Sequence, residues 1–262
     1  MNGRRSVEVR PFPRDRRLVT GAMRAGRRTT PMHGLLELDV TEATRLLHQS
    51  DPPLSLTAFV VASVARAAAA HPEVHVYRTW RGRLASHSRV DVATIVEVDT
   101  EDGPFPLAHV VRDAARRDVV DLTAELRRIK GDAGLRSEGG WLAQAATIGT
   151  RVPGVIPALY GLMGRSVRIR QRIGTVGVTA VGMFAGGGGF GITGLTLMSL
   201  QVVVGGVAPR PRAINGEVRI RDTLDLTVTI DHNVVDGGPA TRFGAELRRL
   251  IEEASVLHPG AI

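Results

Sequence analysis

The order of apolar and polar residues predicts a strand and two helices in the first third of the chain. Residues 33–43 alternate as a half-buried strand does, and residues 42–49 have the pattern of a short helix. Residues 55–74 start at Ser55, a favourable N-cap, and continue with apolar residues at helical spacing and a run of alanines as far as Pro72.

Two strands and another helix follow. Residues 83–98 and 106–114 have strand-like composition and flank a polar turn, and residues 121–133 form an amphipathic helix pattern that Gly131 closes. The first half of the chain is therefore predicted to run strand, helices, strand pair, helix.

The C-terminal part predicts a sheet closed by a terminal helix. Residues 174–182 and 197–231 indicate three strands, two of them joined at Asn215-Gly216, the strongest short hairpin signal. A helix pattern covers residues 238–254. The chain shows no internal repeat and no linker, so we expect one domain over residues 1–262.

Composition narrows the class of protein. Apolar residues make up 43% of the 262 positions and charged residues 23%, which is typical of a compact fold. The net charge of +8 is only weak evidence for nucleic-acid binding, because the arginines are scattered and aromatic residues are only 4%. The positive charge could instead attract a phosphorylated cofactor. No cysteine is present, which excludes disulfides and thiolate chemistry and fits a cytoplasmic protein.

Three segments could be mistaken for targeting or membrane sequences. Residues 1–30 form a basic arm with no apolar stretch of a secretory signal. Residues 173–209 lack charge but are rich in glycine and β-branched residues, so buried strands are expected. Residues 139–172 are an apolar insertion interrupted by Pro153 and Pro157. We expect no membrane span; the insertion could line an acyl or acceptor pocket or pack against a partner.

The sequence DHNVVDGGPATRF, residues 231–243, carries the candidate chemistry. Imidazole is the side chain that most readily accepts a proton near neutral pH, so His232 in a turn made possible by Gly237 and Gly238 is a candidate general base. A histidine that only satisfies backbone groups is the alternative. The other histidines show no metal-ligand spacing, and no metal site is expected.

These residues resemble the Asp-His-Arg-x-x-Asp-Gly signature of the catalytic domain of dihydrolipoyl acyltransferases from 2-oxoacid dehydrogenase complexes. That domain is related to chloramphenicol acetyltransferase and, more distantly, to peptide condensation domains. Residues 174–184 are similar to the family's Gly-Thr-Phe-Thr-Ile-Ser-Asn-Leu-Gly strand, and residues 55–74 and 90–114 to its first long helix and strand pair. The resemblance implies an α/β (α+β), chloramphenicol acetyltransferase-like two-layer sandwich, with a mixed sheet covered by helices.

The resemblance also implies an activity. An acyl group would move from a thioester, acyl-CoA or acyl-dihydrolipoamide, to a thiol, hydroxyl or amine, with His232 as general base. Thr179 falls at the position of the serine that stabilises the oxyanion, although it could be a plain β-branched strand residue. Donor and base would come from different subunits of a homotrimer, with possible larger assembly. CoA or dihydrolipoamide would be a co-substrate, and no tightly bound cofactor is expected.

In the family, the aspartate at the place of Asp236 is buried and paired with an arginine from the N-terminal region, which holds the turn in shape. Arg24 is the candidate partner here, preferred over Arg27 and Arg28. Removing one member of a buried ion pair costs about 3 to 5 kcal/mol.

Two residues depart from the family pattern: Asn233 replaces the arginine of the signature, and Ala180 replaces the asparagine after the catalytic serine. No lipoyl or peripheral-subunit-binding domain is expected before the catalytic unit, so acyl-CoA or another protein's carrier would supply the acyl group. A non-catalytic scaffold or subunit and a condensation-type reaction on the same fold are the alternative functions.

Overall fold

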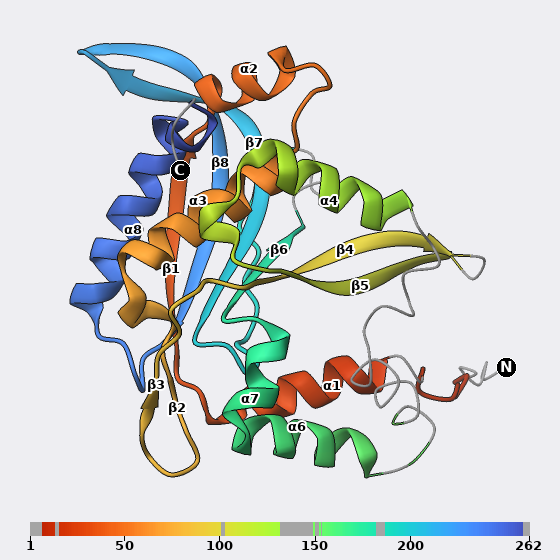
Figure 1. The fold of residues 1–262 in the computed structure, drawn as a ribbon. Coiled ribbons are helices and arrows are strands. Elements are labelled where there is room, and N and C mark those ends of the chain that lie inside the picture. The colour runs from red at the N-terminus through yellow and green to blue at the C-terminus, as the bar shows by residue number, and fades with distance from the viewer. Residues whose placement is uncertain are drawn as a thin grey trace, which may run out of the picture.

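A six-stranded mixed sheet forms the centre of the molecule (Figure 1). The computed structural model describes residues 7–13, 16–100, 103–131, 149, 152, 154–181 and 187–258. The strand order is β1-β8-β7-β6-β4-β5; β6 runs parallel to β4 and β7, and the other neighbours are antiparallel. The strands are β1 (Pro31–Asp39), β4 (Val92–Thr100), β5 (Gly103–Val111), β6 (Val176–Ala180), β7 (Leu200–Ile214) and β8 (Glu217–Asp231).

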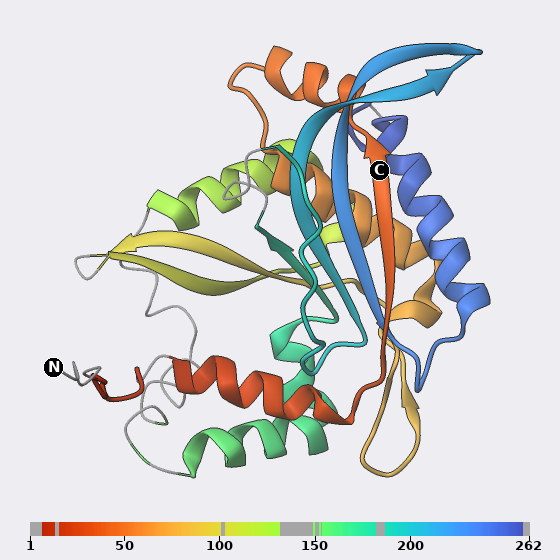
Figure 2. The same ribbon diagram turned by 180° about the vertical axis from the view of Figure 1, so that it is seen from behind.

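Helices cover one face of this sheet, as a view from behind makes clear (Figure 2). They are α3 (Leu56–Ala70), α4 (Val119–Gly131) and α8 (Gly237–Glu252), while α2 (Thr41–Gln49) lies against the sheet end that α8 also reaches. The two-layer arrangement predicted from the sequence, a mixed sheet covered by helices, is confirmed. The 3-10 turns are Gly26–Arg28, Pro72–His75, Ala114–Arg116, Gln171–Ile173 and Ser255–Leu257.

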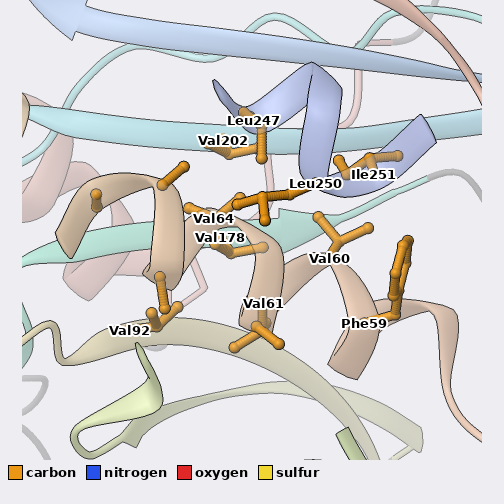
Figure 3. Packing of buried hydrophobic residues seen from close by; sticks show 14 of the residues in the cluster. Phe59, Val60, Val61, Val64, Val92, Val178, Val202, Leu247, Leu250 and Ile251 are labelled. Atoms are coloured by element: carbon orange, nitrogen blue, oxygen red, sulfur yellow. The ribbon is translucent and has the colours of Figure 1, made fainter. Parts of the chain in front are cut away.

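Helix α3 is the centre of the core. It is apolar on nearly all sides, as a helix enclosed by other elements must be, and the hydroxyl oxygen of Ser55 accepts a hydrogen bond from Ala58 N to cap it as predicted. Phe59 and Val61 are fully buried, and residues of α3 pack against α8 and the sheet (Figure 3). Burial of each such side chain stabilises the fold by about 1.5–3 kcal/mol. The helix layer thereby fixes the strands that carry the site.

The predicted hairpin at Asn215-Gly216 is confirmed and determines where β8 begins. Both residues have positive φ, 52° and 83°, the backbone that a two-residue type I′ turn requires. The two strands that it joins are 15 residues long, and their tip projects beyond the sheet (Figure 1). Strand β8 therefore carries His232 to the end of the sheet opposite the hairpin tip.

The sheet face turned away from the helices contains a buried ion pair. Alternate residues of β8 point to this face, and the side chain of Asp225 is fully buried there. Its carboxylate accepts hydrogen bonds from the guanidinium of Arg210, at 2.6 Å, and from Gly189 N, at 2.6 Å. The backbone at Gly189 is thus fixed across this face.

The basic arm is more ordered than the sequence indicated, because it contains helix α1 (Arg16–Ala25). Part of the apolar insertion, α6 (Val155–Arg165), packs along it, and α7 (Val167–Arg170) follows. The hydroxyl of Tyr160 donates a hydrogen bond to Leu18 O, at 3.2 Å. The insertion thus supplies the apolar surface that stabilises α1. Residues 1–6 and 14–15 of the arm, and 139–148, 150–151 and 153 of the insertion, lie outside the described residues.

A small two-stranded sheet lies apart from the main one. It consists of β2 (Tyr77–Arg78) and β3 (Leu84–Ala85), paired antiparallel. It lies at the same end of the molecule as α1, α6 and α7 (Figure 1). None of the helices in the described part of the chain has the length and apolar character needed to cross a membrane.

Candidate active site

His232 lies in the turn between β8 and α8, next to the start of β1. Its backbone N–H donates to Thr30 O, at 2.8 Å, and its side chain is half exposed. The ring atom Nδ1 lies 3.0 Å from Val235 O. Because a carbonyl oxygen can only accept, Nδ1 carries the hydrogen and the lone pair stays on Nε2. The turn therefore presents the imidazole as an oriented proton acceptor.

Asp231 is the buried carboxylate that holds this turn, and the sequence analysis missed this role. Its Oδ1 accepts three hydrogen bonds: from Thr30 N at 3.0 Å, from Asn233 N at 3.1 Å and from Asn233 Nδ2 at 2.8 Å. The bond to the backbone two residues on is an Asx turn, which an aspartate directly after a strand favours. That local signal could have identified it.

Asn233, a departure from the family signature, joins the turn to the N-terminal arm. Its amide nitrogen donates to Arg28 O at 3.1 Å, and its amide oxygen lies 3.2 Å from the hydroxyl of Thr30. A neutral amide can make all these contacts because it both donates and accepts, which a guanidinium cannot. The substitution therefore serves the local structure of the turn.

The predicted buried pair of Asp236 with Arg24 is not formed within the chain. The Asp236 side chain is 91% exposed, and its Oδ1 lies 3.8 Å from Nδ1 of His232. Among the described residues, neither Arg24 nor the alternatives Arg27 and Arg28 form an ion pair. The physical reason is that Asp231 already occupies the inside of the turn, so the carboxylate of Asp236, five residues on, points to solvent.

The prediction that Gly237 and Gly238 form the turn is wrong. Both are the first residues of α8, and neither has a positive φ. A Cβ at Gly237 would meet nothing within 4 Å, so the chain itself does not require glycine there. The turn consists of the residues from His232 to Val235, before the helix begins.

Thr179 is half buried on β6, and its side chain points away from the helix layer, whereas Ala180 packs against the core. Thr179 pairs with Val203, which pairs with Thr227, five residues before His232. At about 3.3 Å per residue and 4.8 Å per strand, Thr179 and His232 lie ~17 Å apart along the sheet and ~10 Å across it. One chain does not bring them together.

Aromatic and basic side chains lie at the same end of the sheet as His232. The guanidinium of Arg170 lies 3.5 Å from the centroid of the Tyr77 ring, which stacks on His87 at 5.5 Å. Burial lowers the pKa of Arg170 to about 10, against the opposing effects of Tyr77 and Asp231, so it stays charged at neutral pH. This arginine supplies positive charge near the carboxylate that holds the turn.

His75 is buried beside this group and is no candidate base. Burial, followed by the effect of His87, lowers its pKa to about 4, and its Nδ1 has no hydrogen-bond partner. Over the described ranges, no three histidine, aspartate or glutamate side chains gather in a way that could hold a metal ion.

In sequence, the C-terminal part of the chain is similar to a known family. Residues 171–258, which include both Thr179 and His232, match the catalytic domain of the 2-oxoacid dehydrogenase acyltransferases. No curated protein matches the sequence.

Comparisons of structure cover nearly the whole chain. The cubic core of the pyruvate dehydrogenase multienzyme complex matches with 17% identity over 96% of this chain and 94% of that one, at a TM-score of 0.70. Dihydrolipoamide acetyltransferase from Azotobacter vinelandii, studied for the catalytic roles of a serine, a histidine and an asparagine, matches with 16% identity over 96% and 94%, at 0.71. Chloramphenicol acetyltransferase matches with 16% identity over 94% and 98%, at 0.50.

The sequence match contains the strand of Thr179 and the turn of His232, and the structural matches extend the same architecture to the rest of the chain. The resemblance found in the sequence is thereby confirmed. The chain has the chloramphenicol acetyltransferase-like fold, and its residues 171–258 match the model of the 2-oxoacid dehydrogenase acyltransferase catalytic domain.

Proposed function

We propose that this protein is an acyltransferase that moves an acyl group from a thioester to a thiol, hydroxyl or amine, with His232 as general base. The observation that carries the proposal is the hydrogen bond from His232 Nδ1 to Val235 O, at 3.0 Å, on a half-exposed ring. It leaves the Nε2 lone pair free to accept a proton.

The reaction would use this lone pair twice. Nε2 takes the proton from the acceptor as the acceptor's heteroatom attacks the thioester carbonyl. The tetrahedral intermediate then collapses, the carbon–sulfur bond breaks, and the departing thiolate takes the proton back from the imidazolium. Asp231 keeps the turn in place through its three hydrogen bonds but does not touch the substrate.

Thr179 is proposed as the hydroxyl donor to the oxyanion of the intermediate, a role worth about 10²- to 10³-fold in rate by analogy with other oxyanion donors. It lies ~17 Å along the sheet and ~10 Å across it from His232, ~20 Å in a straight line, which is too far for one chain to build the site. We therefore propose that Thr179 of one subunit meets His232 of another in a homotrimer, as the resemblance implies.

The acyl donor is proposed to be acyl-CoA or an acyl-dihydrolipoamide carried by another protein. The A. vinelandii neighbour is a dihydrolipoamide acetyltransferase and another neighbour forms a cubic core, which supports both the thioester chemistry and the possibility of further assembly.

Release of free CoA thiol from a panel of acyl-CoAs tests the proposal, with dihydrolipoamide and simple amines or alcohols as acceptors. His232→Ala should abolish turnover while the oligomer, measured by size-exclusion chromatography with light scattering, stays unchanged. The matched control is His48→Ala, on α2 and far from the turn, which should keep wild-type turnover. Equal turnover of wild type and His232→Ala would refute the role of His232. A lack of turnover in every protein would favour a non-catalytic scaffold.

A further inference from the structure

A cavity of about 490 Å³ lies beside the His232 end of the sheet and is lined mainly by arginines. It opens where Asp91 precedes β4, Arg112 follows β5 and Thr175 precedes β6. No residue of the His232 turn lines it. Its size is that of a pocket for a small organic molecule.

The charge of the lining is strongly positive. Four of the ten lining residues are arginines, and the only carboxylate is that of Asp91. That carboxylate is already occupied: Oδ2 accepts from Arg112 at 2.8 Å, and Oδ1 accepts from Asp113 N at 2.9 Å. The one acid of the lining is thus already paired and does not neutralise Arg168.

Arg168 differs from the other arginines of the cavity. It is exposed on α7, and within the described part of the chain it takes part in no hydrogen bond or ion pair. Arg89, by contrast, has a distant partner in Asp113, at 3.7 Å. A guanidinium that the fold does not use for its own stability is available to a ligand.

Hydrogen bonds join the segments that line the cavity. Arg112 donates to Gln171 O at 3.0 Å and to Arg172 O at 2.7 Å, which joins the end of β5 to the segment after α7. Asp91 N donates to the hydroxyl of Thr175, at 3.2 Å, and ties the starts of β4 and β6 together. A preorganised lining lowers the entropy cost of binding.

Neutral polar groups complete the wall. Ser86, Ser88 and Gln171 offer hydroxyl and amide donors. The ring of His87 stacks on Tyr77 at 5.5 Å, and burial, followed by the charge of Arg170, lowers its pKa. Guanidinium forks with hydroxyl donors are the groups that bind phosphate oxygens in proteins.

We propose that this cavity binds the phosphate groups of an organic phosphate that carries at least two negative charges. The arginines and serines would hold the phosphates, and the cavity has room for the organic part. The proposal does not depend on the acyl transfer proposed for the His232 turn, because the two sets of residues do not overlap.

Isothermal titration calorimetry of the full chain with inorganic pyrophosphate, at low ionic strength, tests the proposed phosphate site. Arg168→Ala should weaken binding about tenfold or more, the value of a lost charge-assisted hydrogen bond. The matched control Arg128→Ala removes the same charge from the exposed side of α4, and it should change affinity by about twofold or less. His232→Ala should bind as wild type does, which separates this test from that of the acyl transfer.

ADP and coenzyme A, titrated in the same way, distinguish the two sources of phosphate. Tighter binding of ADP than of pyrophosphate, lost in Arg168→Ala, would support the site with a nucleotide as its ligand. Tighter binding of coenzyme A alone, lost in the same variant, would support the site as the place where a thioester carrier's phosphates bind. Absence of binding by all three ligands, or equal losses in Arg168→Ala and Arg128→Ala, would overturn the proposal.

Discussion

The imidazole of His232 donates its Nδ1 hydrogen to the carbonyl oxygen of Val235, three residues on, across 3.0 Å. A single turn thus fixes both the tautomer of the ring and its direction. The turn can do so because Asp231, immediately before it, is anchored to the first strand through Thr30. Orientation of the candidate base therefore depends on the packing of the N-terminal arm against the end of β8.

Replacement of Asp231 by alanine should lower the free energy of unfolding by about 3 kcal/mol, because Thr30 N and Asn233 lose a buried charged acceptor. Urea denaturation measures the loss. Asp236→Ala is the matched control; its carboxylate is exposed, and the expected change is about 0.5 kcal/mol or less. Equal losses in the two variants would contradict the assignment of Asp231 as the carboxylate that holds the turn.

Much of this arrangement could be predicted from the sequence, for identifiable reasons. The hairpin at Asn215-Gly216 and the N-cap at Ser55 are local signals that depend on few neighbours, and both are confirmed. His232 at the end of a strand could be found because its strand pattern continues to Asp231.

Other features depend on contacts that no local pattern encodes. Whether Asp231 or Asp236 turns inward depends on where Thr30 lies, 201 positions away from Asp231 in the chain. Helix α1 could not be predicted from the basic arm alone, because the apolar surface that stabilises it belongs to α6. The basic cavity could not be predicted either, because Arg112 and Arg168 are far apart in the sequence. Only the fold brings the end of β5 and helix α7 to the same cavity.

Because Thr179 and His232 lie far apart within one chain, we propose that each site is shared between two subunits. Two inactive variants should then complement each other. Thr179→Val and His232→Ala should each be inactive alone in the CoA-release assay. Co-expressed, they should form mixed trimers in which about one quarter of the interface sites contain both native side chains, if assembly is random. Recovery of activity to that level supports sites shared between subunits. No recovery in verified mixed oligomers would contradict it.

Thr179 can be tested further by keeping or removing its hydroxyl. Thr179→Ser keeps the donor and should retain most of the turnover number. Thr179→Val has nearly the same shape without the donor, and the expected loss in kcat is about 10²- to 10³-fold. A small, equal effect of both substitutions would show that Thr179 is only a strand residue, since a packing role is insensitive to the hydroxyl.

The stability of the fold at acid pH should depend on Glu125. The hydrogen bond from His109 Nε2 to Oε1, at 2.5 Å, and the ion pair with Arg117, at 2.5 Å, lower its pKa to about 2 despite partial burial. A carboxyl whose pKa is lower in the folded than in the unfolded chain stabilises the fold above the unfolded pKa, ~4.3, and this contribution is lost as pH falls toward 2.

Between pH 6 and pH 3, the wild type should therefore lose about 2 kcal/mol more stability than Glu125→Gln, because the variant has no proton to bind at this position. Urea denaturation at a series of pH values measures the difference. Glu217→Gln is the control: its pair with Arg219 is exposed, at 3.0 Å, and its stability should follow the pH profile of the wild type. If Glu125→Gln and Glu217→Gln gave the same profile, the network of His109, Glu125 and Arg117 would not be the source of the acid sensitivity.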